Sequence, residues 1–156
     1  MATTNKNNVS HLRSHIGYRL RVVSNAVSHG FAQRLDGCGV TVAEWVILRE
    51  MYSSDEETSP SIVAKTTGLT RGAVSKLIER LLKKGLVTRN EGTEDRRYQN
   101  IKLTPKAVKL IPKLANLADE NDKTFFSMLT ASERAMLLAA LAKIADAHRL
   151  NTSPID

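Results

Sequence analysis

Two short helical patterns separated by a tight turn constrain the fold of this chain more than any other feature of its sequence. The first, PSIVAKTT at residues 60–67, begins with proline, which suits the first helical position, and follows Ser59, a good helix cap. Gly68 can adopt the left-handed conformation that ends a helix. Thr70 then caps a second pattern, RGAVSKLIERLLKK at residues 71–84. The sequence therefore predicts two helices that meet at an abrupt change of direction.

The second of these predicted helices has one apolar and one polar face. The apolar face repeats every three or four residues and consists of Val74, Leu77, Ile78, Leu81 and Leu82. The opposite face is polar and largely basic, and carries Arg71, Ser75, Lys76, Glu79 and Arg80. A helix divided in this way suits the DNA major groove, where arginine and lysine pair with guanine edges and hydroxyl side chains contact bases or phosphates.

Gly72 is an unexpected residue at the start of this helix, because glycine costs about 1 kcal/mol of helix stability relative to alanine. Two explanations stay open. The glycine allows the helix to approach a DNA backbone closely, or it is simply tolerated near a frayed first turn.

The positive charge of the chain is concentrated in its middle third. Residues 58–109 hold twelve Lys or Arg and four Asp or Glu, a net charge of +8, whereas the remainder, with eleven and twelve, carries −1. This asymmetry predicts a polyanionic partner for the middle segment. A solvated basic face with no partner is the alternative that charge alone leaves open.

Longer helical patterns flank this middle segment. An apolar stripe predicts one long helix over residues 9–36, and Thr41 with Glu44 forms a capping box before the helix VAEWVILREMY. Residues 86–90 and 98–103 alternate as two strands of a hairpin. Further caps at Thr104 and Thr130 begin two C-terminal helices. The expected fold is mainly α with one small β-hairpin, in a single domain spanning residues 1–156.

Composition and motif content exclude several classes of function. No apolar run approaches the roughly 20 residues that span a bilayer. The polar start MATTNKNNVSHLRSH lacks the apolar core of a signal peptide. The single cysteine excludes an internal disulfide, so a cytoplasmic setting without membrane attachment is expected. The chain has no dinucleotide or phosphate-loop motif and no HExxH, so neither enzymatic activity, a catalytic residue nor a cofactor is expected.

The middle of the chain resembles the MarR family of bacterial winged-helix transcription regulators. The resemblance rests on residues 59–87, SPSIVAKTTGLTRGAVSKLIERLLKKGLV, and on DRRYQNIKLT at 95–104. The segment TVAEWVILREM at 41–51 is also similar to the second helix of that family. One departure is Ala107, where many members carry glycine. The resemblance implies a winged helix-turn-helix lobe over residues 41–104 between dimerisation helices at 9–36 and 105–148.

The same resemblance implies a function and a set of partners. It indicates a homodimeric repressor that binds a pseudo-palindromic double-stranded operator and is released by a small-molecule effector, such as an aromatic acid. Apolar stripes on the long terminal helices favour the dimer independently, because one small lobe cannot cover them.

The predicted DNA-binding residues lie in the two short helices and in the hairpin. They are Ser59, Ser61, Thr70, Arg71, Gly72, Ser75, Lys76, Arg80, Asp95, Arg96 and Arg97. The resemblance assigns Arg97 to the minor groove, whose negative potential attracts arginine, with Asp95 holding the guanidinium in place and Arg96 on a phosphate. A surface ion pair that only stiffens the loop is the alternative.

Other candidate residues carry weaker signals. His15, Arg19 and Trp45 are candidates for effector binding, although core packing explains Trp45 and a salt bridge explains Arg19 equally simply. Cys38 lies between two glycines near a helix start, and oxidant sensing there is a minor hypothesis. His11 and His15 have metal-ligand spacing but no further ligands nearby in sequence, so no metal site is predicted.

Two other functions compete with DNA regulation. One is a dimerisation module attached to an enzyme. This chain has no room for the catalytic domain that such a module accompanies. The other is a winged helix that binds protein rather than DNA, whose recognition face should be acidic or apolar. The basic side chains of Arg71, Lys76 and Arg80 favour DNA.

Overall fold

The computed structural model describes residues 9–54, 58–90 and 100–150. Within these ranges the chain is mostly helical, with one antiparallel pair of strands, as the sequence predicted. The elements in chain order are η2 (Leu12–Ser14), α1 (Ile16–Leu35), η3 (Asp36–Cys38), α2 (Val42–Ser53), α3 (Pro60–Thr67), α4 (Arg71–Lys83), β1 (Val87–Arg89), β2 (Ile101–Leu103), α5 (Pro105–Phe126) and α6 (Ala131–Ala147).

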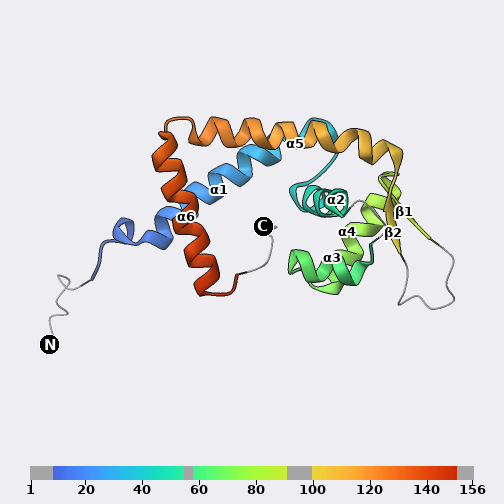
Figure 1. Ribbon diagram of the computed structural model, residues 1–156, viewed down its shortest axis with the longest axis horizontal. Coiled ribbons are helices and arrows are strands. Elements are labelled where there is room, and N and C mark those ends of the chain that lie inside the picture. Colours follow the sequence, from blue (N-terminus) through green and yellow to red (C-terminus); the bar gives the residue numbers. More distant parts are fainter. Residues whose placement is uncertain (1–8, 55–57, 91–99, 151–156) are drawn as a thin grey trace, which may run out of the picture.

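The elements form a lobe and an arm (Figure 1). The lobe contains α2, α3, α4 and the two strands, and the arm contains α5 with α1 packed along it. Helix α6 turns away from α5 at 109° and runs apart from the lobe. In the described part of the chain no single helix is long and apolar enough to cross a membrane, although α5 and α6 together pass that test as a bent pair.

The hydrophobic core lies where the arm joins the lobe. It combines the inner faces of α2 and α4, the first half of α5, the end of α1 and both strands. Its fully buried members include Leu35, Ile47, Leu48, Ile78, Leu81, Ile101, Ile111 and Leu114. Four of the predicted inner-face residues of α4 are buried, and Leu82 packs against the same core from a partly exposed position. Ala107, the departure from the family pattern, is fully buried in this core.

The helix starts follow the predicted caps. Thr41 and Glu44 form a reciprocal capping box at the start of α2, and Thr130 and Glu133 form another at the start of α6. Thr104 accepts a hydrogen bond from the backbone N–H of Ala107 before α5. Each of these side chains satisfies an N–H group that has no partner within its helix.

The N-terminal helix starts later than predicted. The sequence pattern indicated a helix from residue 9, but α1 begins at Ile16, because His15 is extended (φ −75°, ψ 125°) and separates α1 from the short turn η2. Side chains next to η2 stabilise this turn. The Nδ1 atom of His11 accepts from the backbone of Arg13, and the hydroxyl of Ser14 donates to the carbonyl of His11. Such local bonds compete with helix formation.

The hairpin ladder lies within the two predicted strands, and a third segment joins it. The predicted strands covered residues 86–90 and 98–103, of which 98–99 lie outside the described residues, and the observed ladder pairs Val87–Arg89 with Ile101–Leu103. On its other side Ile101 pairs with Thr58 through two backbone bonds of 2.7 and 3.1 Å. The residues around Thr58 were predicted as part of an acidic loop, so this bridge between the loop and the hairpin was missed.

Candidate nucleic-acid interface

The turn between α3 and α4 has the geometry that the sequence predicted. Ser59 caps α3 by accepting from the N–H of Ile62, and Gly68 ends it in the left-handed conformation (φ 72°). Thr70 caps α4 by accepting from the N–H of Ala73. Thr67 is buried, and the sequence pattern did not single it out. Its hydroxyl donates to the carbonyl of Val63 and accepts from the backbone N–H of Leu69 in the turn. The two helices are therefore fixed relative to one another.

Nearly all predicted DNA-contacting residues in this part of the lobe are exposed. Ser59 is half-buried, and the exposed ones are Ser61, Thr70, Arg71, Gly72, Ser75, Lys76 and Arg80. Lys83 is also exposed and follows Arg80 by three residues, so it extends the same basic face. The structure thus leaves three predicted cations and three predicted hydroxyl residues exposed on α3, on α4 and in the turn between them.

Glu79, the acidic residue of α4, is held by the first strand. Arg89 in β1 donates from Nη2 to Glu79 Oε1 at 2.7 Å. This pair ties the base of the hairpin to α4, and it offsets the negative charge of Glu79 within a surface otherwise rich in cations. Sequence reasoning missed it, because no periodic pattern relates a strand residue to a helix residue ten positions earlier.

The tip of the hairpin lies outside the described residues, and with it Asp95, Arg96 and Arg97. The base of the hairpin is described. The β1–β2 ladder continues into a backbone bond of 3.0 Å from Asn90 to Asn100. The hairpin therefore leaves the lobe beside the C-terminal half of α4, which Arg89 contacts.

The predicted effector-binding residues do not meet within one chain. Arg19 is exposed near the start of α1 and lines a hollow of about 430 Å³ with Arg13, Tyr18 and two valines. Trp45 is half-buried and packs edge-on against Phe31, with ring centroids 6.2 Å apart. Phe31 follows Arg19 by twelve residues, roughly 18 Å along a helix. Exposed His15 precedes α1.

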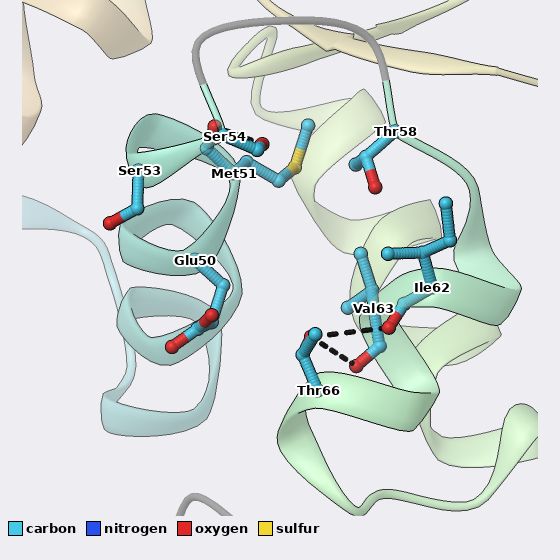
Figure 2. Close-up of a pocket in the computed structure, with 8 residues that line it drawn as sticks. All are labelled: Glu50, Met51, Ser53, Ser54, Thr58, Ile62, Val63 and Thr66. Carbon is cyan, nitrogen blue, oxygen red and sulfur yellow. Dashed lines mark hydrogen bonds between the residues drawn. The ribbon is translucent and has the colours of Figure 1, made fainter.

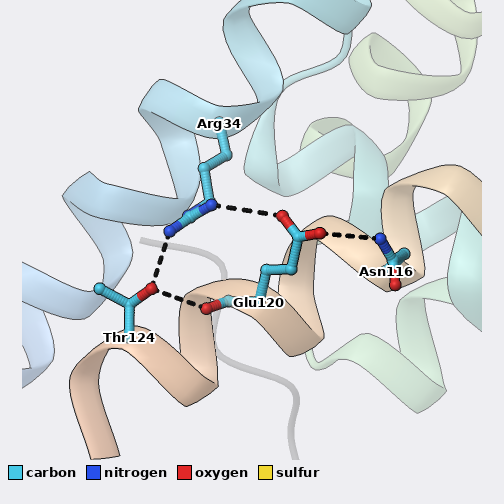
Figure 3. A network of polar contacts seen from close by, with 4 residues as sticks. All are labelled: Arg34, Asn116, Glu120 and Thr124. Carbon is cyan, nitrogen blue, oxygen red and sulfur yellow. Dashed lines mark hydrogen bonds and ion pairs between the residues drawn. The ribbon is translucent and has the colours of Figure 1, made fainter.

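Further hollows lie in the described parts of the chain. A cavity of about 190 Å³ separates α2 from α3 and is lined by residues such as Met51, Ile62 and Val63 (Figure 2). A second hollow, of about 390 Å³, lies beside a polar network in which Arg34 of α1 contacts Glu120 and Thr124 of α5 (Figure 3). Nearby, Gly30 gives α1 its close approach to α5, because a Cβ there would lie 2.7 Å from the Phe125 ring.

Cys38 and the histidines show no arrangement typical of a reactive or metal-binding site. The thiol of Cys38 is free and half-buried, and the residue packs against the core. Within the described ranges no three His, Cys, Asp or Glu side chains lie close enough to hold a metal ion.

Sequence reasoning also missed an ion pair behind the interface, in which the carboxylate is buried and the lysine is partly exposed. Glu44, assigned only to a capping box, is fully buried, and its Oε2 accepts from Lys84 Nζ at 2.6 Å. Lys84 is the residue after the last one of α4. The two residues lie forty positions apart, so only the fold brings them together.

The arrangement of a helix-turn-helix followed by a hairpin and framed by long helices occurs in known regulators. A model of the MarR family matches residues 39–97. The solved structure of Bordetella bronchiseptica BpsR, described with a mechanism for regulation of its DNA binding by 6-hydroxynicotinic acid, is similar with a TM-score of 0.77. The two chains are 25% identical, and the match covers 88% of this chain and 98% of BpsR.

Staphylococcus aureus MepR, solved in complex with DNA, is similar with a TM-score of 0.76 and 26% identity over 85% of this chain and 97% of MepR. The family match over residues 39–97 and these structures support the assignment of the chain as a MarR-family winged-helix regulator. Reduced MarR from E. coli shares the fold, with a TM-score of 0.71 and 24% identity over 83% of this chain and 96% of MarR. As a MarR-family winged-helix regulator, the protein has α4 in the position of the recognition helix and the β1–β2 hairpin in that of the wing.

Proposed function

We propose that this MarR-family regulator binds a pseudo-palindromic operator as a homodimer, represses transcription there, and is released by a small-molecule effector. The observation that carries the proposal is the exposed face of α4, where Arg71, Lys76 and Arg80 project from a helix whose other side is buried. A recognition helix of this kind reads base edges in the major groove, and its flanking hydroxyls position it on phosphates.

The wing contributes a second contact in this proposal. Its tip carries Asp95, Arg96 and Arg97, and its base is fixed to α4 through Arg89. Arg97 enters the minor groove, where a narrow A·T-rich segment attracts guanidinium groups, Asp95 orients it, and Arg96 binds a phosphate.

A homodimer is supported by apolar side chains that the single chain leaves uncovered. Helix α6 has no buried residue, although it carries many apolar side chains. Of these, Met136, Leu138 and Ile144 are 62%, 63% and 48% exposed. The first half of α1 is similarly exposed at Ile16 and Val22. A helix that is apolar on several sides is stable only when other protein surface covers it. In the proposed dimer, α1, α5 and α6 of the second copy supply that surface.

Release by an effector is proposed from the relatives. BpsR is described as regulated in its DNA binding by 6-hydroxynicotinic acid, an aromatic acid. In this chain Arg19 offers a guanidinium for a carboxylate, His15 precedes the same helix, and Trp45 offers an aromatic surface for a ring. Trp45 lies in α2 and contacts Phe31, which follows Arg19 by twelve residues of α1. A pocket that uses both Arg19 and Trp45 therefore takes one of them from the second protomer.

Binding to DNA is tested by fluorescence anisotropy with duplexes selected from a random pool, compared with scrambled duplexes across a salt series. Selective binding that weakens steeply with salt supports the proposal. A triple change of Arg71, Lys76 and Arg80 to Gln should abolish selectivity, whereas the matched triple change of Lys109, Lys113 and Lys123, which are exposed on α5, should preserve it. Equal weak binding to all duplexes would instead favour a protein-binding winged helix.

A further inference from the structure

The C-terminal end of the recognition helix is bound directly to the segment that follows the dimerisation helix α1. Lys84 Nζ donates to the carbonyl of Gly39 at 2.8 Å and to Glu44 Oε2 at 2.6 Å. Gly39 ends the short turn η3, which follows α1 without a gap. One side chain therefore connects α4 both to the end of α1 and to the beginning of α2.

The second arm helix, α5, meets α4 at the same place. Lys106, in the first turn of α5, donates from Nζ to the carbonyl of Lys84 at 2.9 Å. Thr104, the cap of α5, donates its hydroxyl to the carbonyl of Gly85 at 2.8 Å. We call the contacts of Lys84 and Gly85 with Gly39, Glu44, Thr104 and Lys106 the arm junction.

The arm junction is built from contacts that resist bending. Glu44 is fully buried, and its Oε2 also accepts from the backbone N–H of Thr41 at 2.9 Å, so the carboxylate is fixed by α2 itself. A buried carboxylate is strongly destabilised without its cation, and this holds Lys84 in one position. The side chain of Lys84 is only 36% exposed.

We infer that Lys84 is a positioning residue for DNA binding, because it sets the angle between the recognition helix and the dimer arms. This inference rests on the proposed dimeric DNA-binding function. In a two-fold dimer that angle fixes the distance between the two recognition helices, and hence the spacing of half-sites that both can reach. Lys84 thereby determines which operators the dimer accepts without contacting a base.

A first experiment needs no DNA. Spin labels are placed at Ser75→Cys on α4 and Lys113→Cys on α5 in a Cys38→Ser background, both at exposed positions. Labelled chains are mixed with excess unlabelled protein, and pulsed electron–electron double resonance gives the distribution of distances between the two labels of one chain. Lys84→Met should broaden or shift this distribution. Lys83→Met, which removes the same charge from an exposed neighbour, should leave it as in the unmodified protein.

Lys84→Met alone leaves Glu44 buried and unpaired, so a second variant guards against misfolding. Glu44→Gln combined with Lys84→Met removes both charges and keeps a residue that supports a capping box. This double variant should fold cooperatively and show the same altered distances. Lys84→Arg, which preserves the cation, should restore a narrower distribution than Lys84→Met.

A second experiment measures half-site spacing on selected duplexes. Each base pair inserted between half-sites separates them by about 3.4 Å and rotates one about the axis. The unmodified dimer should bind the native spacing at least about tenfold more tightly than a duplex with one inserted pair. The Glu44→Gln/Lys84→Met variant should lose most of this preference, whereas Lys83→Met should weaken binding to both duplexes equally.

The outcomes separate the inference from the function on which it rests. Unchanged distances together with an unchanged spacing preference would overturn the role of Lys84. The Lys84 variants could have altered label distances while the unmodified protein binds no duplex selectively. This result would support the structural role of Lys84 in the arm junction and overturn the proposed DNA-binding function. Altered distances together with relaxed spacing support both.

Discussion

At Gly72 the free protein has space that a side chain could fill. A Cβ built there meets no atom within 4 Å in the described structure, and the residue is the second of α4. We expect Gly72→Ala to raise the free energy of unfolding by up to about 1 kcal/mol, because alanine favours the helix. We also expect it to weaken DNA binding about tenfold, because the added methyl separates the helix from the DNA backbone.

Gly17 provides the matched control for this change. It is the second residue of α1, and a Cβ there also meets no atom within 4 Å among the described residues. Chemical denaturation and anisotropy should show that Gly17→Ala stabilises the protein without changing DNA affinity. If Gly72→Ala behaves in the same way, the glycine is merely tolerated and the close-approach explanation is wrong.

Residues whose partners are near in sequence were predictable, and residues whose partners are distant were not. Ser59, Thr41 and Thr70 cap helices through bonds that span three positions, so the letters alone indicate their roles. Glu44 was recognised only as a partner of Thr41, whereas its bond to Lys84 depends on the packing of α2 against α4. A capping pattern cannot show that a carboxylate will be buried.

At the scale of single elements, the start of α6 should respond to acid. Two hydrogen bonds from Thr130, one from its backbone N–H and one from its hydroxyl, lower the pKa of Glu133. A carboxylate with a lowered pKa in the folded state stabilises the protein above its unfolded pKa, near 4.3, and loses this contribution as the pH falls through the folded pKa. The capping box is therefore weakened only in acid.

Glu133→Gln isolates this effect, because glutamine supports a capping box but does not titrate in this range. Thermal unfolding of both proteins should show the unmodified chain more stable than Glu133→Gln at pH 6. The difference should shrink as the pH is lowered from about 4 toward 3. Thr130→Ala, which removes the hydroxyl, is the control in which the pH-dependent difference should be smaller. A constant difference at all pH values would contradict the assignment.

The elements that sequence reasoning misjudged are those whose bounds depend on tertiary contacts. The apolar stripe of α1 continues N-terminally through Leu12 in the sequence. The helix nevertheless begins only at Ile16, because side chains around His11 form local hydrogen bonds that hold a separate turn. Thr58 has no strand pattern around it and pairs with Ile101 only because the hairpin lies alongside. The helix pair α3 and α4, with its own caps and turn glycine, was predicted almost to the residue.

For the whole molecule, α6 is the element that a single chain leaves unexplained. Its residues are exposed on every side, and it contacts the rest of the chain mainly at its start, where Arg134 bonds to the carbonyl of Phe126 and pairs with Asp122. An apolar helix in this position is stable only when something covers it. The proposed homodimer would cover it with a second copy of the same chain.

Leu138→Glu tests this assembly at a side chain that is 63% exposed within one chain. Because the single chain does not bury Leu138, the change should leave helix content by circular dichroism unaltered. Light scattering after size exclusion should give twice 17.2 kDa for the unmodified protein and a mass close to 17.2 kDa for the variant. A buried, unpaired carboxylate opposes association at such an interface.

Ile62→Glu is the matched control, because Ile62 is 55% exposed on α3 and lies in the lobe rather than the arm. This variant should keep the dimeric mass. Leu138→Glu should also bind a two-half-site duplex far more weakly, since a monomer presents only one recognition helix and gains nothing from the second half-site. A dimeric mass for Leu138→Glu would place the dimer contacts elsewhere on the arm, whereas a monomeric unmodified protein would leave α6 for another partner.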